Sequence, residues 1–176
     1  MPHMPQMLEP KHHAMLDEAA RRGLAVTDGI RLCFQVLALA GAIDRDCVAR
    51  LAPKRLSEGK FVLLFLLHGQ SQGLSPHELA AGAGVTRATI TGLLDGLERD
   101  GFVQRQAGQE DRRKIAVTLT GKGRTAAAKL FKEHTAWIGS LFAGLSSADQ
   151  RQLGELLARV WRGTDAGRAA LQGAGR

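Results

Sequence analysis

Tyrosine is absent from this 176-residue chain, and cysteine occurs only twice. Two cysteines are too few for a disulfide-stapled secreted fold and are typical of a reducing compartment, so we expect a cytoplasmic protein. No apolar run approaches the ~18–20 residues that span a bilayer, so we expect no membrane segment. The opening stretch, MPHMPQMLEPKHHAM, has no apolar core, so we expect no signal peptide.

The motifs of common enzyme classes are also missing. We find no GxxxxGK[ST] phosphate loop, no nucleophile elbow, no HExxH and no CxxC. The carboxylates Asp95, Glu98 and Asp100 lie beside Arg99, which is typical of a charged helix surface and not of an acid–base pair in a cleft. We therefore expect no enzyme activity, no catalytic residue and no cofactor.

Basic residues outnumber acidic ones, 24 against 17, which gives a formal charge of +7. The excess is mild, so its placement matters more than its size. Three histidines near the start, His3, His12 and His13, could ligate a metal. No cysteine or carboxylate cluster accompanies them at ligand spacing, so we expect a flexible arm and no metal site.

The most informative stretch is 75–120, where two short helices precede a hairpin. A capping box with proline at the first helical position starts the first helix: Ser75, Pro76 and Glu78. Gly82 and Gly84 are expected to break it, because glycine takes left-handed conformations readily. Thr86 is the expected cap of the second helix, which Gly101 ends.

The second helix has two different sides. Its buried stripe follows the helical period: Ile90, Leu93, Leu94 and Leu97. The outward side is small and polar, which lets the backbone approach base edges: Arg87, Ala88, Thr89, Thr91, Gly92, Asp95 and Arg99. Arg87, Thr89 and Thr91 are candidates for base contacts, and Ala88 could meet a thymine methyl. The candidates for phosphate contacts are Ser75, His77, Thr86, Arg99 and Lys114.

Two β-prone runs, residues 102–105 and 115–119, flank the polar loop AGQEDRRK with its three consecutive cations. A basic hairpin in this position is a wing whose arginines could enter a narrow minor groove. The order of elements predicts a mainly α fold, a winged helix-turn-helix with a small antiparallel β-wing. Such a module places one helix in the DNA major groove. The alternatives are a winged helix used only for protein contacts, or a sequence-blind architectural DNA binder.

The residues at the wing and its exit carry a family resemblance. Asp111, Arg112 and Arg113, followed by Val117, Leu119, Thr120 and Gly123, resemble the DxR…VxLTxxG signature of MarR-family regulators. The stretch 97–103 is similar to that family's LExxGLV junction. The resemblance implies a homodimeric, ligand-responsive transcription factor, usually a repressor, on a pseudo-palindromic operator. It also implies that Arg113 enters the minor groove and that Asp111 orients it, while Arg112 could be an ordinary solvated charge.

The flanking segments suit such a dimer. Asp28 is expected to open a helix to about Leu51 that is apolar nearly all round, so a second subunit is its natural neighbour. We divide the chain into an N-terminal arm (1–27), a dimerisation helix (28–56), the DNA-binding domain (57–120), and C-terminal dimerisation helices with a tail (121–176). The arm is expected to be loose over residues 1–14, with a short helix after it.

The resemblance also implies an effector pocket where the first long helix, the Ser57 helix and the base of the DNA module meet. The residues that could line it are Phe34, Ser57, Lys60, Phe61 and Leu64. Lys60 stands where the family's TxxQF pattern often has glutamine, and a lysine beside aromatic rings would suit an aromatic carboxylate. The alternative is a solvated lysine in the first helical turn.

Cys33 suggests a second kind of trigger. The stretch 32–35, LCFQ, is similar to the helix start of peroxide-sensing members of the family, where this cysteine is the sensor. Those members hold the thiolate with tyrosine hydroxyls, which this chain lacks, so an inert cysteine is the competing interpretation.

Overall fold

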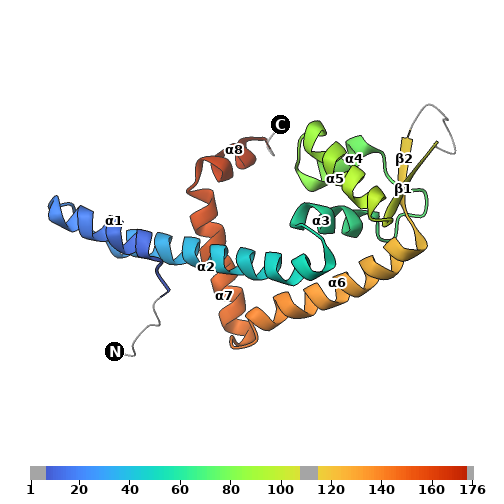
Figure 1. The fold of residues 1–176 in the computed structure, drawn as a ribbon. Coiled ribbons are helices and arrows are strands. Elements are labelled where there is room, and N and C mark those ends of the chain that lie inside the picture. Colours follow the sequence, from blue (N-terminus) through green and yellow to red (C-terminus); the bar gives the residue numbers. More distant parts are fainter. Residues whose placement is uncertain (1–6, 108–114, 174–176) are drawn as a thin grey trace. The chain divides into compact units, whose positions relative to one another are not determined.

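The computed structural model of the chain describes residues 7–107 and 115–173 and divides into two units, 1–124 and 125–176. Figure 1 shows the elements of both units. The described part is mainly helical and holds one two-stranded antiparallel sheet, which confirms the predicted fold class. Across these two ranges, no helix combines the length and the apolar character needed to cross a membrane.

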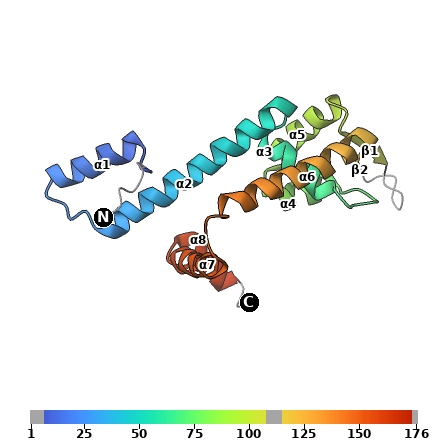
Figure 2. The same ribbon diagram turned by 90° about the horizontal axis from the view of Figure 1, so that it is seen from below.

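The first unit opens with α1 (Pro10–Arg21) and α2 (Asp28–Leu51). The predicted loose arm is therefore wrong for residues 10–14, because Pro10 takes the first helical position and Glu9 forms a capping box with His12. Helix α1 lies beside α2 (Figure 2), and the His12 ring stacks on Phe34 with centroids 5.0 Å apart. Since His12 is only 4% exposed, this contact buries a side chain that the sequence suggested was free.

After α2, a short 3-10 turn η1 (Ala52–Lys54) leads into α3 (Glu58–Leu67). The expected helix from Asp28 to about Leu51 is confirmed as α2, and Ser57 caps α3 because its hydroxyl accepts the backbone N–H of Lys60. Helix α3 is the centre of the first unit's core, with three of its four leucines almost fully buried: Leu63, Leu64 and Leu67.

Helices α4 (Pro76–Ala83) and α5 (Arg87–Arg99) follow as the helix-turn-helix. Gly84 ends α4 in the left-handed region, at φ +65°. Gly82 does not break the helix as predicted. It lies within α4, where a Cβ would sit 3.1 Å from a methyl of Leu66, so its small size serves the packing of α4 on α3.

The wing consists of β1 (Val103–Ala107) and β2 (Ile115–Leu119), with Val103 opposite Leu119 and Arg105 opposite Val117. Its base is anchored by Leu74, which exchanges two backbone hydrogen bonds with Val117, at 3.0 and 2.8 Å. The wing therefore leaves the module from a fixed root.

Helix α6 (Gly121–Leu141) starts in the first unit and continues into the second, which also holds α7 (Ser147–Arg162) and α8 (Asp165–Gly173). A capping box between Ser146 and Asp149 starts α7 after the end of α6. Residues 165–173 do not continue α7. The Thr164 hydroxyl instead accepts the Gly167 N–H and begins a separate helix.

Candidate nucleic-acid interface

The outward face of α5 is open, as the sequence predicted. Every residue assigned to it is exposed: Arg87, Ala88, Thr89, Thr91, Gly92, Asp95 and Arg99. On the other side Ile90, Leu94 and Leu97 are at most 2% exposed and hold the helix on the core. The helix therefore presents its small polar face to solvent because its leucines anchor the opposite face.

The threonines of this face already have internal partners. The Thr86 hydroxyl accepts the Thr89 N–H at 3.2 Å and lies 2.9 Å from the Thr89 hydroxyl. Thr91 donates its hydroxyl proton to the Arg87 carbonyl at 3.1 Å. In this arrangement the Thr91 oxygen can only accept from a base, and the bases that donate in the major groove are adenine and cytosine.

The start of α4 is closed by reciprocal hydrogen bonds. The Ser75 hydroxyl accepts the Glu78 N–H at 3.2 Å and donates to the Glu78 carboxylate at 2.7 Å. The same carboxylate accepts the Ser75 N–H at 2.7 Å. A phosphate at Ser75 would have to displace Glu78, so His77, which is exposed one position inside the helix, is the more accessible of the two predicted contacts.

Four of the predicted DNA-contacting residues meet at one hollow of about 430 Å³. It is lined by Ser75, Pro76, His77, Arg87, Ile90, Thr91 and Ile115. The start of α4, the first turns of α5 and the start of β2 thus form a single concave surface. The predicted wing residues Asp111, Arg112, Arg113 and Lys114 lie outside the described residues.

A connection between the wing and α5 was missed by the sequence analysis. Arg105 of β1 donates from Nη1 to Glu98 Oε2 and from Nη2 to Asp95 Oδ1, each at 2.6 Å. The Arg105 backbone N–H also donates to Glu98, at 3.2 Å. The hydrogen bond to Asp95 and the charge of Glu98 raise the pKa of the Arg105 guanidinium. Asp95 and Glu98 therefore lie at the helix surface, as the sequence indicated, but both are paired with Arg105.

The five predicted effector residues do not form one cluster within a single chain. Ser57, Lys60, Phe61 and Leu64 share the start of α3, where Leu64 is only 1% exposed. Phe34 instead stacks on His12 of α1. It precedes Leu51 by 17 positions on α2, which is about 25 Å of helical rise.

Lys60 is neither solvated nor free. Its Nζ lies 2.8 Å from Asp100 Oδ2, and its side chain is only 17% exposed. The stem crosses α5 at Gly96, where a Cβ would come within 2.7 Å of Lys60 Cε. This hydrogen bond lowers the pKa of the Asp100 carboxyl. The Lys60 side chain therefore links α3 to the C-terminal end of α5.

The two cysteines differ in environment. Cys33 is exposed on α2, whereas Cys47 is buried, and that burial raises the pKa of the Cys47 thiol. No group of three potential metal ligands occurs in the parts of the chain that the structure describes, and His3 lies outside them.

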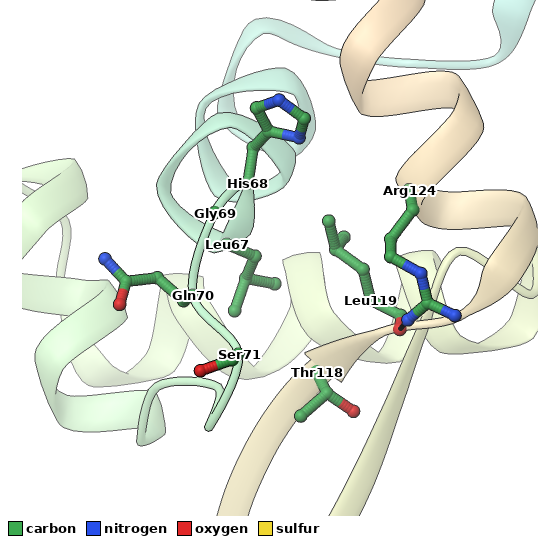
Figure 3. Close-up of a pocket in the computed structure, with 8 residues that line it drawn as sticks. All are labelled: Leu67, His68, Gly69, Gln70, Ser71, Thr118, Leu119 and Arg124. Atoms are coloured by element: carbon green, nitrogen blue, oxygen red, sulfur yellow. Dashed lines mark hydrogen bonds between the residues drawn. The ribbon is translucent and has the colours of Figure 1, made fainter.

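A separate hollow of about 290 Å³ lies between the α3–α4 connection and β2 (Figure 3). In the close-up the Gln70 amide points away from the side chains of Leu67 and Leu119, and the polar side chains that line the hollow do not converge. Residues 69–73, GQSQG, do spell the GxSxG pattern of a nucleophile elbow, which the sequence analysis passed over. They follow a helix and not a strand, so the strand-to-helix turn of that motif is missing.

Comparisons with known proteins agree with this geometry. The MarR family model matches residues 56–115. The HTH-type transcriptional repressor YetL of Bacillus subtilis (strain 168) is 42% identical over 156 residues, which cover 86% of this chain and 93% of that protein.

Two solved structures are similar in fold. CouR from Rhodococcus jostii RHA1, bound to p-coumaroyl-CoA, has a TM-score of 0.61 and 26% identity over 73% of this chain and 90% of its own. FabT of Streptococcus pneumoniae, in complex with DNA, has a TM-score of 0.67 and 22% identity over 77% of this chain and 96% of its own. The structure has an exposed helix α5 beside a wing, and the sequence is 42% identical to a repressor over most of its length. The chain therefore belongs to the MarR family of DNA-binding transcriptional regulators.

Proposed function

We propose that the protein is a homodimeric repressor that occupies a pseudo-palindromic operator and releases it when a small aromatic acid or phenol binds. The observation that carries DNA recognition is the exposed, small-residue face of α5 next to the hollow at His77 and Arg87. Arg87, Thr89 and Thr91 would contact bases, with Ala88 against a thymine methyl. The wing residues Asp111 to Lys114 would contact the adjacent minor groove and its phosphates.

The apolar surface of the helices outside the DNA module supports the dimer. In the single chain α7 buries none of its residues, and its stripe of Leu156, Leu157, Val160 and Trp161 is 46–62% exposed. Leu32, Val36 and Leu39 of α2 are likewise about half exposed. A second copy would cover such surfaces and hold two reading helices about 34–36 Å apart, the spacing of one DNA turn.

Lys60 supports an anionic effector. The Lys60 ammonium lies 2.8 Å from the Asp100 carboxylate, which follows the last residue of α5. A ligand carboxylate bound at the start of α3 would compete with Asp100 for this ammonium. Loss of that bond would free the end of the recognition helix, so the ligand would favour an arrangement that reads DNA poorly. CouR, solved with p-coumaroyl-CoA, shows that one relative accepts a ligand with an aromatic acyl group.

Two measurements test this proposal. An operator selected from random DNA should bind at least ~10³-fold more tightly than competitor DNA at physiological salt, and Arg113→Ala should weaken that binding and reduce its salt dependence. Equal affinity for all duplexes would instead indicate an architectural binder. A panel of benzoic, hydroxybenzoic and hydroxycinnamic acids should include a compound that raises the melting temperature and releases the operator. A response that is unchanged in Lys60→Ala would remove Lys60 from the mechanism.

The alternative trigger is oxidation of Cys33. The exposure of its thiol in the single chain favours access by a hydroperoxide. This alternative predicts that cumene hydroperoxide releases the operator from the wild type and not from Cys33→Ser. Operator binding that survives the oxidant would eliminate it.

A further inference from the structure

Arg105 occupies an inward position at the root of the wing. Side chains two residues apart on a strand point to the same face, so Arg105 shares a face with Val103. Val103 is 2% exposed and belongs to the core of the module. The side chain that follows it on this face is therefore directed toward the body of the module and not toward solvent, and here it is a cation.

Two carboxylates on successive turns of α5 pair with the Arg105 guanidinium. Asp95 and Glu98 are three residues apart on α5, so their side chains emerge on one side of the helix. The guanidinium reaches both carboxylates at 2.6 Å, and Glu98 also accepts the Arg105 backbone N–H. Three hydrogen bonds thus join the first strand of the wing to the helix that precedes it, at side-chain exposures of 28% for Arg105 and 39% for Glu98.

The position of Asp95 makes this contact relevant to DNA. Arg87, Thr91 and Asp95 follow each other at intervals of four, so Asp95 lies on the face that we assign to the major groove. A free carboxylate there would repel phosphates. Arg105, which comes from the wing, pairs with this charge through its guanidinium.

We propose that Arg105, Asp95 and Glu98 form a positioning clamp that fixes the angle between the wing and the recognition helix. This inference depends on the proposed function, in which α5 and the wing contact adjacent grooves of one duplex. With the clamp closed, both elements reach the DNA as one preorganised surface. With the clamp open, the wing has to be ordered during binding, and the entropy lost in that ordering weakens the complex.

Neutralising Asp95 and Glu98 distinguishes the clamp from a simple charge effect, because the two explanations predict opposite changes in operator affinity. If Asp95 and Glu98 were only surface charges, neutralising them would remove repulsion and tighten DNA binding. If they hold the wing, the isosteric double variant Asp95→Asn/Glu98→Gln should bind the operator at least about 10-fold more weakly. The expected loss comes with a shallower salt dependence, because a misplaced wing makes fewer phosphate contacts.

The experiment uses the full-length protein and an operator selected with the wild type from random duplex DNA. Dissociation constants are measured by fluorescence anisotropy at several salt concentrations for the wild type, the double variant, Arg105→Ala and Arg105→Lys. Gln104→Ala, an exposed neighbour on the opposite face of β1, is the matched control and should stay within about twofold of the wild type. Arg105→Lys keeps the charge but lacks the planar fork, so it should fall clearly below the wild type.

The clamp would be refuted if the double variant bound the operator as tightly as the wild type or more tightly. Wild-type affinity in Arg105→Lys would also refute it. If Arg105→Ala does not fold, the double variant still decides, since it keeps both side-chain shapes. Failure of the wild type to select any DNA sequence would contradict the proposed function itself. Successful selection followed by unaffected variants would contradict the clamp alone.

Discussion

Replacing Gly123 by alanine should destabilise the protein, because at this residue the first turn of α6 lies against the backbone of Phe102, just after α5. A Cβ at Gly123 would overlap the carbonyl oxygen of Phe102, lie 2.9 Å from its carbonyl carbon and lie 3.3 Å from a methyl of Leu119. The turn is held there by Thr120, whose N–H donates to the Phe102 carbonyl at 3.0 Å and whose hydroxyl donates to the Gly101 carbonyl at 2.7 Å.

The magnitude follows from this contact. Non-bonded heavy atoms pack at about 3–4 Å, and the overlap with the carbonyl oxygen is the tighter of the two contacts, so the two backbones would have to separate by more than about 1 Å. Overpacking of this kind costs about 1–3 kcal/mol, and each strained Thr120 hydrogen bond adds about 1 kcal/mol. Alanine in place of glycine in a helix returns up to about 1 kcal/mol. The net loss of about 2–4 kcal/mol should lower the melting temperature by about 4–16 °C.

The assay is thermal unfolding without DNA, with Gly92→Ala as the control. Gly92 is also helical, but a Cβ there meets nothing within 4 Å, so its replacement should raise the melting temperature by about 1–4 °C. A Gly123→Ala protein that melts at or above the wild-type temperature would show that this close approach is not required.

Three further predictions concern the reading helix and its neighbours. Gly92→Ala, although more stable, should bind the operator more weakly in anisotropy titrations, because the added methyl projects from the groove face of α5; unchanged affinity would place Gly92 away from the DNA. The Lys60 hydrogen bond lowers the pKa of Asp100 below its ordinary value of 3.8, so this pair stabilises the fold above that value and loses its effect as the pH falls through the lower folded-state value. The gap in urea midpoint between the wild type and Asp100→Asn should therefore be full at pH 6 and shrink below about pH 4; a gap that grows on acidification would contradict the pairing. Gly96→Ala should displace the Lys60 side chain and reproduce the Asp100→Asn effect on urea midpoint at neutral pH, and a wild-type midpoint would show that Lys60 can reach Asp100 by another path.

The helix starts were predictable because their chemistry is local. Ser57, Ser75, Thr86 and Ser146 each accept an N–H three positions later, which a short string of residues already specifies. The same local logic at Pro10 would have found the start of α1. Residues 1–14 were instead expected to be loose, and the capping role of Glu9 was missed.

The contacts that join different elements were not predictable in the same way. Arg105 meets Asp95 and Glu98 only because the turn after Gly101, at φ +73°, directs β1 back along α5. Lys60 meets Asp100 across 40 positions of sequence, over a glycine that provides the space. The alternation of Val103 and Arg105 was the one available signal, since an inward charge at a strand root needs a partner.

The bare apolar stripe of α7 has a consequence for how the regulator responds to its own abundance. If two copies must join before either stripe is covered, assembly is a mass-action step that precedes DNA binding. Below the dissociation constant of that step, the concentration of competent dimers rises with the square of the total protein. Promoter occupancy would then respond steeply to the number of regulator molecules made, even before any effector is present.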